Sequence, residues 1–473
     1  MIPSPKSLVP LLMAGSLVAI AVVLWIWQVG QEVGPQEIET AEAEAAVISP
    51  NLSDSLVLAP TIEEPADAPD EPSPLIAPPT PPLELPRLSV LAEPPDWESL
   101  EIYQNTITRR DFERLLTDIF TTSDFWRNYI MVDDEQAVVR THASDVEEAF
   151  ALRFAASEDD AASVPRIWQP GAKLAPAPED RPLDGLHIAI DPGHIGGEWA
   201  KMEERWFSLN GEPAVTEGDM TLKVARMLKP ELEKLGARVT LVRDKPEPIT
   251  PMRPEMLLEI AAEQSDTSPA AMQRLAERLF YRTAEIRARA HIVNHAIQPD
   301  LVLCLHFNAE AWGNPARPKL VDQTHFHLLL NGGYTDSEVA LADQRFAMLK
   351  KLLQRTHEEE ALVGATVADV FAEASGLPPY TYTANAPNVR PVNDHPFLWA
   401  RNLLANRLYD CPVIFMEPYV MNSKHDYARI QAGDYDGLRE INGRLVPSIY
   451  REYVDALTDG LAQHYRAIRG VLE

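Results

Sequence analysis

The chain has 473 residues, a length that predicts about two or three folded units rather than one. Its formal net charge is −29, from 71 acidic and 42 basic residues. This balance excludes nucleic acid as a partner, because phosphate contacts require clustered Lys and Arg. The only two cysteines, Cys304 and Cys411, lie in apolar runs and are predicted to be buried core thiols, so a disulfide scaffold and a cysteine-type zinc site are excluded as well.

The N-terminal segment predicts a transmembrane anchor. Residues 8–27 are twenty consecutive residues without a charge, and they end in a Trp-Ile-Trp cluster. This length spans a bilayer core, and Trp suits the membrane interface. A cleaved signal peptide is the alternative, but its apolar core is usually shorter and is followed by a small-residue cleavage site. Because Lys6 precedes the segment, residues 1–7 are predicted to lie in the cytoplasm and the rest of the chain outside it.

Two further regions precede the main domain. Residues 28–95 hold thirteen acidic residues and one basic residue, and a dozen prolines fall between Pro60 and Pro95. Charge repulsion and proline predict an extended, disordered spacer there. Residues 96–168 predict a small α+β accessory domain, with a helix that Thr108 caps and short strands at 129–132 and 137–139.

Residues 183–473 predict the main domain, after a proline-rich connection. Short apolar runs alternate with helical patterns, which is typical of an α/β domain with a mostly parallel twisted sheet between helices. The expected strands are 186–190, 238–242, 301–305, 326–330 and 413–416. The expected helices are 217–235, 269–296, 337–356, 361–374 and 447–469.

Polar side chains follow three of these strands. His194 comes shortly after the first strand, in Asp-Pro-Gly-His, while His306 and Glu417 end two others. In open α/β sheets the sites form at the carboxyl ends of the strands. Two imidazoles and a carboxylate are therefore expected at one edge of the sheet, and ordinary packing does not explain them, because a strand interior would bury them without partners.

Glu217 is the fourth member of this predicted group. It opens a helix in Thr216-Glu-Gly-Asp219, where Thr216 can cap and Asp219 can return the bond. A first-turn carboxylate can simply interact with the helix dipole. Beside two strand-end histidines, however, it is the natural third ligand of a zinc ion, because a His, Glu, His set leaves the fourth position open, as hydrolytic zinc sites do.

The motifs around these residues resemble the zinc-dependent N-acetylmuramoyl-L-alanine amidases, the type 3 catalytic domain that cuts peptidoglycan. Five blocks occur in family order between residue 186 and the C-terminus. They are Ile188-Ala-Ile-Asp-Pro-Gly-His194-Ile-Gly-Gly, Glu217-Gly-Asp219-Met-Thr-Leu222, Arg289-Ala-His-Ile-Val-Asn294, Asp300-Leu-Val-Leu-Cys-Leu-His306-Phe-Asn308-Ala, and Pro412-Val-Ile-Phe-Met-Glu417 followed by Asn422. Each block alone is weak evidence, but five in order are strong evidence.

The resemblance implies roles for the matched residues. His194, Glu217 and His306 would bind Zn²⁺, and Glu417 would be the catalytic carboxylate that moves a proton from water to the leaving amine. Four further residues are candidates for orienting a ligand or contacting the substrate: Asp219, Asn308, His395 and Arg289. For Asp219 and Asn308, a helix cap and a loop amide are equally good readings.

The sequence also departs from the family pattern. Ile195 interrupts the Gly-His-Gly-Gly that is usual in the family, and the loop 198–216 is long and carries two tryptophans. Only one residue separates Glu417 from the aromatic Tyr419, whereas the family usually has about two between its catalytic glutamate and an aromatic position. The helix 361–374 could block the cleft, as inserted helices do in some relatives, although a surface helix is the simpler interpretation. The histidine pairs His325 with His327 and His291 with His295 are interpreted as structural.

An amidase acting in cell-wall remodelling or daughter-cell separation is the favoured function. A zinc amidohydrolase for another amide and a non-catalytic peptidoglycan-binding scaffold are the alternatives, and the presence of all four polar groups counts against the scaffold. The expected partners are peptidoglycan, the inner membrane through the N-terminal helix, and an activator protein. The catalytic domain is then expected on the periplasmic side of a bacterial inner membrane, held by a single-pass anchor.

Overall fold

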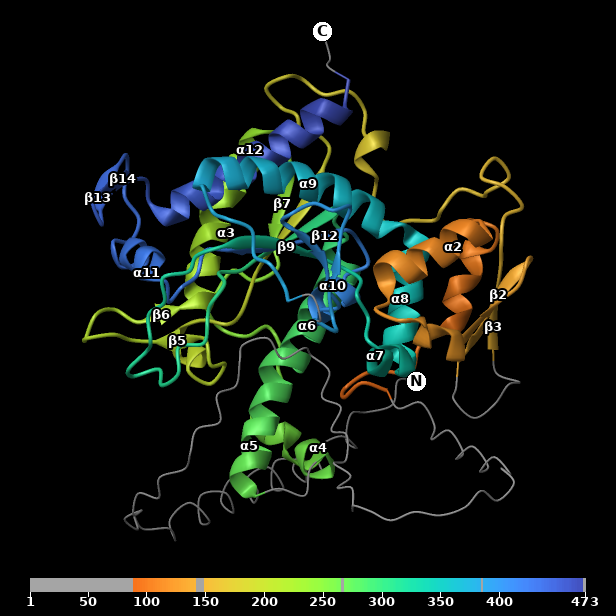
Figure 1. Cartoon of the computed structure of the whole chain (residues 1–473), viewed down its shortest axis with the longest axis horizontal. Helices are drawn as coiled ribbons and strands as arrows, with labels where there is room; N and C mark the ends of the chain where they lie inside the picture. The colour runs from red at the N-terminus through yellow and green to blue at the C-terminus, as the bar shows by residue number, and fades with distance from the viewer. Residues whose placement is uncertain (1–87, 142–148, 265–267, 384–385, 471–473) are drawn as a thin grey trace, which may run out of the picture. The chain divides into compact units, whose positions relative to one another are not determined.

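The protein is described by a computed structural model, which covers residues 88–141, 149–264, 268–383 and 386–470 (Figure 1). The predicted cytoplasmic segment 1–7, the anchor 8–27 and most of the spacer 28–95 lie outside these residues. Within the described ranges, no helix combines the length and the apolar character that crossing a membrane requires.

Seven strands form the main sheet: β4 (His187–Pro192), β7 (Arg238–Leu241), β8 (Leu301–Leu305), β9 (Phe326–Leu330), β10 (Arg390–Pro391), β11 (Leu398–Ala400) and β12 (Val413–Pro418). Their order across the sheet is β10-β11-β9-β12-β8-β4-β7. The pairs β11–β9, β12–β8, β4–β8 and β4–β7 are parallel. The pairs β12–β9 and β10–β11 are antiparallel. The predicted α/β domain is confirmed, with a sheet that is mixed but mostly parallel.

The central strands are buried on both faces. In β8, Leu301, Leu303 and Leu305 belong to one hydrophobic cluster, whereas Val302 and Cys304 belong to a second one. Strands covered on both sides appear in a sequence as continuous apolar runs, which explains why β8 and β9 have the predicted bounds. The second cluster also contains Cys411, and both cysteines are free and buried, as predicted.

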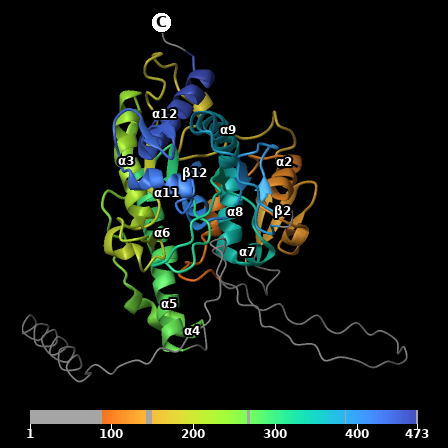
Figure 2. The same ribbon diagram turned by 60° about the vertical axis from the view of Figure 1, so that its left-hand side comes forward.

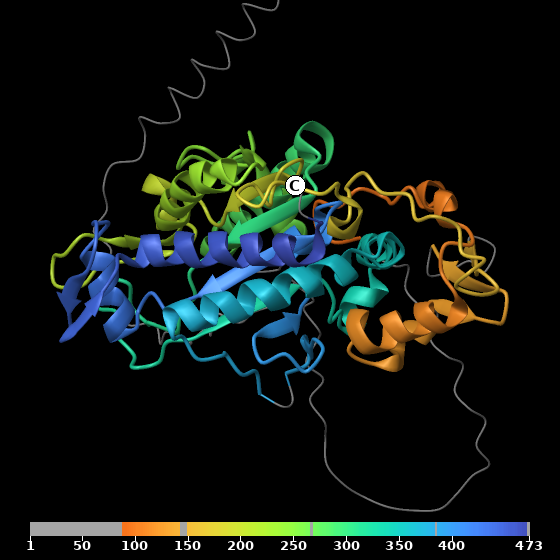
Figure 3. The same ribbon diagram turned by 90° about the horizontal axis from the view of Figure 1, so that it is seen from above.

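Long helices cover one face of the sheet. They are α3 (Glu217–Lys234), α9 (Thr356–Ser375) and α12 (Ile449–Ile468). Figure 3 shows α9 and α12 side by side, and both contribute residues to the larger hydrophobic cluster. The buried side chains of α9 include Val363, Val367 and Phe371, so the predicted helix 361–374 is part of a longer core helix that packs on the sheet. The interpretation as a simple surface helix is therefore wrong.

The opposite face carries α10 (Leu404–Leu408) and a long helical stretch that projects beyond the sheet (Figure 2). The prediction of one helix over 269–296 is confirmed in outline, because α5 (Pro269–Arg278) continues through a π-helical turn into α6 (Glu285–Ile292). Beside α5 lies the short α4 (Leu258–Glu263).

The prediction of one helix over 337–356 is wrong. The segment is divided into α7 (Asp336–Ala340) and α8 (Ala342–Gln354) by Leu341, whose backbone is extended with φ −80° and ψ 127°. The carbonyl oxygens that the break exposes accept hydrogen bonds from the Arg345 guanidinium, at 2.7 Å for Val339 and 3.2 Å for Ala340. A side-chain donor therefore replaces the helical bonds that are lost.

A small N-terminal α+β unit precedes the main domain. It contains α2 (Arg109–Leu115), with Thr108 as its N-cap as predicted, and an antiparallel sheet in the order β1-β2-β3. These strands are β1 (Ile130–Val132), β2 (Gln136–Arg140) and β3 (Ala149–Arg153), of which β3 was not predicted. The unit shares one hydrophobic cluster with the main domain, and Arg345 of α8 donates a 2.9 Å hydrogen bond to the carbonyl of Arg140. Its separate role as an accessory domain stays a prediction.

The remaining elements are short. Two strand pairs are β5 (Trp206–Phe207) with β6 (Val215–Thr216) and β13 (Arg439–Ile441) with β14 (Arg444–Val446), and α11 (Lys424–Gln431) lies between β12 and β13. The 3-10 and π-helical turns are η1 (Trp97–Tyr103), η2 (Leu116–Phe120), η3 (Asp124–Asn128), η4 (Gly171–Lys173), η5 (Gly197–Ala200), η6 (Pro254–Leu257), η7 (Leu279–Ala284) and η8 (Val293–Ile297).

Candidate metal centre

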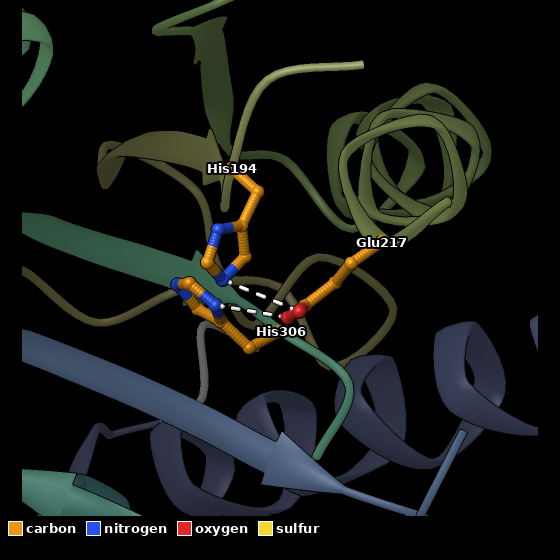
Figure 4. Close-up of side chains that lie close together, drawn as sticks. All are labelled: His194, Glu217 and His306. Atoms are coloured by element: carbon orange, nitrogen blue, oxygen red, sulfur yellow. Dashed lines mark hydrogen bonds and ion pairs between the residues drawn. The ribbon is translucent and has the colours of Figure 1, made fainter. Parts of the chain in front are cut away.

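The carboxyl ends of β4 and β8 and the first residue of α3 bring three side chains together. His194 lies in the loop after β4, Glu217 opens α3, and His306 directly follows β8 (Figure 4). His194 Nε2 lies 3.2 Å from Glu217 Oε2, and His306 Nδ1 lies 3.2 Å from Glu217 Oε1. One ligand atom from each residue lies within 4.8 Å of the other two. In the part of the chain that the structure describes, no other group of His, Cys, Asp and Glu side chains meets this criterion.

The donor set and its spacing fit a zinc ion. With Zn–N and Zn–O bonds of about 2.0–2.1 Å, two ligand atoms of a tetrahedral site are about 3.3 Å apart. The two observed separations of 3.2 Å, each to a different oxygen of Glu217, are close to that value, and one ligand atom from each residue lies within 4.8 Å of the others. Two imidazoles and one carboxylate are also a common ligand set of catalytic zinc. The geometry therefore supports the three ligands that were predicted from the strand ends.

Gly193 permits the close approach of the two histidines of this cluster. A Cβ atom on Gly193 would lie 2.2–2.6 Å from three atoms of the His306 ring, so any other residue there would displace this ring. The next residue, His194, has a positive φ of 61°, in the left-handed region that side chains rarely adopt. Such strain persists where the surroundings hold it in place, as they often do at functional sites.

Arg289 of α6 holds the loop that carries His194. Its guanidinium donates to Asp191 Oδ1 at 2.9 Å and to the carbonyl oxygens of Pro192 and His194, both at 2.8 Å. Its Nε donates to Glu285 at 2.8 Å. Arg289 is 1% exposed, and these hydrogen bonds hold it against the backbone of the loop that carries His194.

Glu203 is a residue of the site that sequence reasoning missed. Its carboxylate lies 2.7 Å from His194 Nδ1 and accepts a 2.8 Å hydrogen bond from the backbone N–H of Ile195. A carboxylate on Nδ1 fixes the tautomer whose Nε2 lone pair points to the shared centre, which is a common arrangement around metal-bound histidines. Burial raises the pKa of Glu203 to about 7. The long loop 198–216 contains several charged residues, and nothing in the sequence distinguishes Glu203 from the others.

Glu417 lies beside the cluster. In the β12–β8 pair Met416 faces Leu305, so Glu417 and His306 are the next residues of these parallel strands. The Phe415 ring stacks on the His306 ring, with centroids 4.3 Å apart. Burial raises the pKa of Glu417 to about 7, His306 acts to lower it, and Glu217 acts to raise it. Among the described residues, no hydrogen-bond or ion-pair partner reaches its carboxylate, which is therefore free for water or substrate.

The other predicted site residues lie apart from this centre. Asp219 accepts hydrogen bonds from the backbone N–H of Gly197 at 3.0 and 3.1 Å, so it fixes the loop, and Glu203 contacts the ligand histidine instead. Thr216 makes no side-chain cap bond to α3, contrary to the predicted cap. The Asn308 side chain accepts from the backbone N–H of Ala309 at 2.7 Å, which is the role of a loop amide. His395 contacts Asp369 of α9 at 3.2 Å.

The histidine pair on β9 is closer to the site than its structural interpretation suggested. Because β9 is antiparallel to β12, it begins at the edge where β12 ends, and His327 lies opposite Glu417. His327 Nε2 is 3.3 Å from the Tyr382 hydroxyl, and His325 Nε2 is 3.3 Å from Glu310. In contrast, the rings of His291 and His295 contact each other at 4.6 Å and belong to none of the metal-type groups in the described ranges.

The fold and the site together define a class of protein. A mostly parallel α/β sheet carries His194 and His306 after the carboxyl ends of two strands, Glu217 of α3 completes a group that could hold a metal ion, and an unpartnered carboxylate lies beside it. This is the architecture of a metal-dependent hydrolase.

Comparison with known families gives the particular family. Residues 188–438, more than half of the chain, match the model of the N-acetylmuramoyl-L-alanine amidases. The chain belongs to this family, which is zinc-dependent, and it is a peptidoglycan amidase of the bacterial cell wall. The resemblance and the predicted amidase activity are thereby confirmed over the scaffold and the other amide substrate.

Several solved structures are similar to this chain. The amidase Ami1 of Mycobacterium abscessus has 17% identity and a TM-score of 0.32, over 59% of this chain and 99% of that one. CwlD of Clostridioides difficile, in complex with the GerS lipoprotein, has 12% identity and a TM-score of 0.34, over 60% and 100%. AmiC2 of Nostoc punctiforme has 16% identity and a TM-score of 0.28, over 60% and 97%. The curated proteins contain no match.

Proposed function

We propose that His194, Glu217 and His306 bind one zinc ion and that Glu417 is the general base and acid of the amidase reaction. The observation that carries this proposal is the convergence of three ligand atoms within 4.8 Å of one another, beside a carboxylate without a partner. When bound, zinc supplies a Lewis acid that polarises the amide carbonyl and makes water more acidic.

The protein's own residues then supply positioning and proton transfer. Glu417 takes a proton from the attacking water as the new C–O bond forms at the lactyl carbonyl of N-acetylmuramic acid. It then gives this proton to the nitrogen of L-alanine as the C–N bond breaks, so the products are a carboxylic acid and an amine. Burial raises the pKa of Glu417 and a nearby metal ion lowers it, so a carboxylate in this position is placed to accept a proton from water and to release it again.

Glu203 and Arg289 have positioning roles in this proposal. Glu203 holds the His194 ring through Nδ1, and Arg289 holds the His194 backbone through its carbonyl oxygen. Together they fix the most strained ligand of the site, whose φ is 61°. Both residues act through His194, so neither is assigned a catalytic role.

Zinc content and product analysis test the metal site. The full-length protein is expected to carry about one zinc per chain and to release intact stem peptides from sacculi, as mass analysis of the digests would show. Treatment with a chelator should abolish release, and added zinc should restore it. His194→Ala should lose both zinc and activity, whereas the matched change His291→Ala, in the helical histidine pair, should keep both. Metal-free protein that releases stem peptides at the normal rate would defeat the proposal.

The placement of the enzyme is also part of the proposal. A peptidoglycan amidase works outside the cytoplasm, and we infer that residues 8–27 anchor it in the inner membrane, that 28–95 is a spacer, and that 96–168 is an accessory domain before the catalytic domain 183–473. We also propose that the enzyme acts in cell-wall remodelling or daughter-cell separation and that an activator protein is one of its partners.

Cell fractionation tests the anchor. The full-length protein should sediment with the membranes and resist extraction by high salt, because an apolar segment of twenty residues spans a bilayer core. A chain in which Leu17, Val18 and Val22 are replaced by Asp should lose membrane retention, since each charge is costly in hydrocarbon. A wild-type protein recovered entirely in the soluble fraction would exclude the anchor and favour a cleaved signal.

A further inference from the structure

One short stretch of the loop 198–216 contacts both nitrogens of the His194 ring. Glu203 lies 2.7 Å from Nδ1, and the Nε of Arg205 lies 3.3 Å from Nε2. The two residues are separated by one position in the chain, and the backbone N–H of Arg205 donates to the carbonyl oxygen of Ala200 at 3.0 Å. The loop therefore holds this ligand histidine from its two opposite sides.

Arg205 also contacts the carboxylate ligand. Its Nε lies 3.2 Å from Glu217 Oε2, the same oxygen that lies 3.2 Å from His194 Nε2. The Nε of Arg205 thus contacts two of the three side chains that a metal ion would bind, at His194 Nε2 and at Glu217 Oε2. Because an arginine N–H can only donate, the neighbouring His194 Nε2 must present its lone pair, which is also what a metal ion requires.

Glu217 needs a cation at this position. Its side chain is 3% exposed, and a buried carboxylate is costly unless it is paired. Among the described residues, Arg205 is the only Lys or Arg side chain that forms an ion pair with Glu217. A guanidinium N–H and a divalent cation compete for these two atoms, because both use the same lone pairs and their positive charges repel.

We propose that Arg205 is a placeholder cation, which occupies the ligand set of the metal-free enzyme and is displaced when the metal binds. This inference rests on the proposed metal site. Arg205 holds His194 and Glu217 in their binding arrangement and compensates the charge of Glu217, and it makes metal binding weaker by the free energy needed to displace it. The metal occupancy of the enzyme is thus adjusted by a residue that is not a ligand.

The structure allows Arg205 to leave without unfolding the loop. Its side chain is 21% exposed, whereas its backbone is fixed at both ends, since the carbonyl oxygen of Arg205 accepts a 3.2 Å hydrogen bond from the N–H of Glu217. Rotation of the side chain toward solvent breaks the contacts to Nε2 of His194 and to Glu217. Glu203 keeps its own contact with Nδ1, so the ring stays oriented for the metal.

Zinc affinity and thermal unfolding of the full-length protein test the proposal. Arg205→Met keeps most of the apolar stem and removes the charge. It should bind zinc about 10-fold more tightly than wild type in competition with a chromophoric chelator, because charge-assisted bonds no longer have to be broken. Its metal-free form should unfold at a lower temperature than metal-free wild type, whereas the two zinc-loaded forms should unfold at similar temperatures.

Lys201→Met is the matched control. Lys201 belongs to the same loop, and its Nζ lies 4.5 Å from the Trp206 ring, so the change removes one positive charge from the loop without touching the ligand set. Its zinc affinity should equal that of wild type. Arg205→Lys retains a charge but loses the planar fork, and it should give an affinity between those of wild type and Arg205→Met.

The outcomes separate this inference from the proposed metal site. Equal or weaker zinc binding by Arg205→Met would overturn the placeholder role, and so would an equal gain in Lys201→Met. If wild type and His194→Ala bind zinc alike, the metal site itself is misassigned, and both proposals fail together. If His194→Ala abolishes binding while Arg205→Met leaves it unchanged, only the placeholder role fails.

Discussion

Replacing Glu417 by Gln is expected to lower kcat by about 10²–10⁴-fold, the usual contribution of a positioned general acid or base. Gln has nearly the same shape as Glu, so the packing of β12 should persist. It cannot accept a proton from water at neutral pH, so bond formation at the carbonyl and protonation of the leaving nitrogen are both impaired. Because Glu417 is not one of the proposed ligands, zinc content and thermal unfolding should stay close to wild type.

The measurement is the rate of stem-peptide release from sacculi at equal zinc loading. Glu310→Gln provides the matched control, because this carboxylate follows β8 closely and contacts His325 Nε2 at 3.3 Å, outside the proposed ligand set. The control should retain activity within a few-fold of wild type. Normal turnover by Glu417→Gln would show that another group transfers the proton.

The core of the site could be predicted because His194 and His306 follow buried strands and Glu417 lies near the end of a third one. The apolar runs that form β4, β8 and β12 are continuous since both faces of the sheet are covered, and they end in polar residues that no hydrophobic core would accept. The strand-end rule then places these residues at one edge. Glu217 could be added because it opens α3, although its supposed cap Thr216 forms no side-chain bond.

The direction of β9 could not be predicted. A strand that is buried on both faces has the same apolar pattern whichever way it runs, so the pattern contains no directional information. The structure has β9 antiparallel to β12, and this direction puts His327 opposite Glu417. A parallel strand would have carried His325 and His327 to the opposite edge of the sheet, where a purely structural interpretation would have been adequate.

The loop residues of the site could not be predicted either. Glu203 and Arg205 stand in an irregular segment without helical or strand periodicity, and their contacts with His194 depend on how the loop folds back. Asp219 was a reasonable candidate for orienting a histidine, but its carboxylate faces the backbone of Gly197. Choosing between nearby carboxylates requires the path of the backbone, which the sequence alone does not define.

Arg289→Met is expected to cause the largest loss of stability among the changes considered. Arg289 and its partners Asp191 and Glu285 are at most 4% exposed in their side chains, and removing one partner of a buried ion pair costs about 3–5 kcal/mol. Both carboxylates keep other donors, since Tyr409 donates to Asp191 at 2.5 Å and the N–H of Ile249 donates to Glu285 at 2.8 Å. A loss near the lower end, about 3 kcal/mol, is therefore expected.

Equilibrium unfolding in urea, with zinc present and absent, measures this loss. Arg274→Met is the control, because Arg274 is exposed on α5 in the same helical stretch, and it should change the free energy of unfolding by about 0.5 kcal/mol or less. A free energy of unfolding for Arg289→Met that matches the control would mean that the buried network contributes nothing to the fold.

Arg289→Lys separates charge from geometry. Lysine restores one positive charge between Asp191 and Glu285, so part of the lost stability should return. It cannot reach both carboxylates and also donate to the carbonyl oxygens of Pro192 and His194, because a single ammonium lacks the planar fork of the guanidinium. The backbone of His194, with its φ of 61°, would then lose its support. Zinc affinity should therefore be lower than in wild type in both Arg289→Met and Arg289→Lys, although Arg289→Lys regains part of the stability. If Arg289→Lys regained zinc affinity and stability to the same extent, charge alone would hold the His194 loop in place.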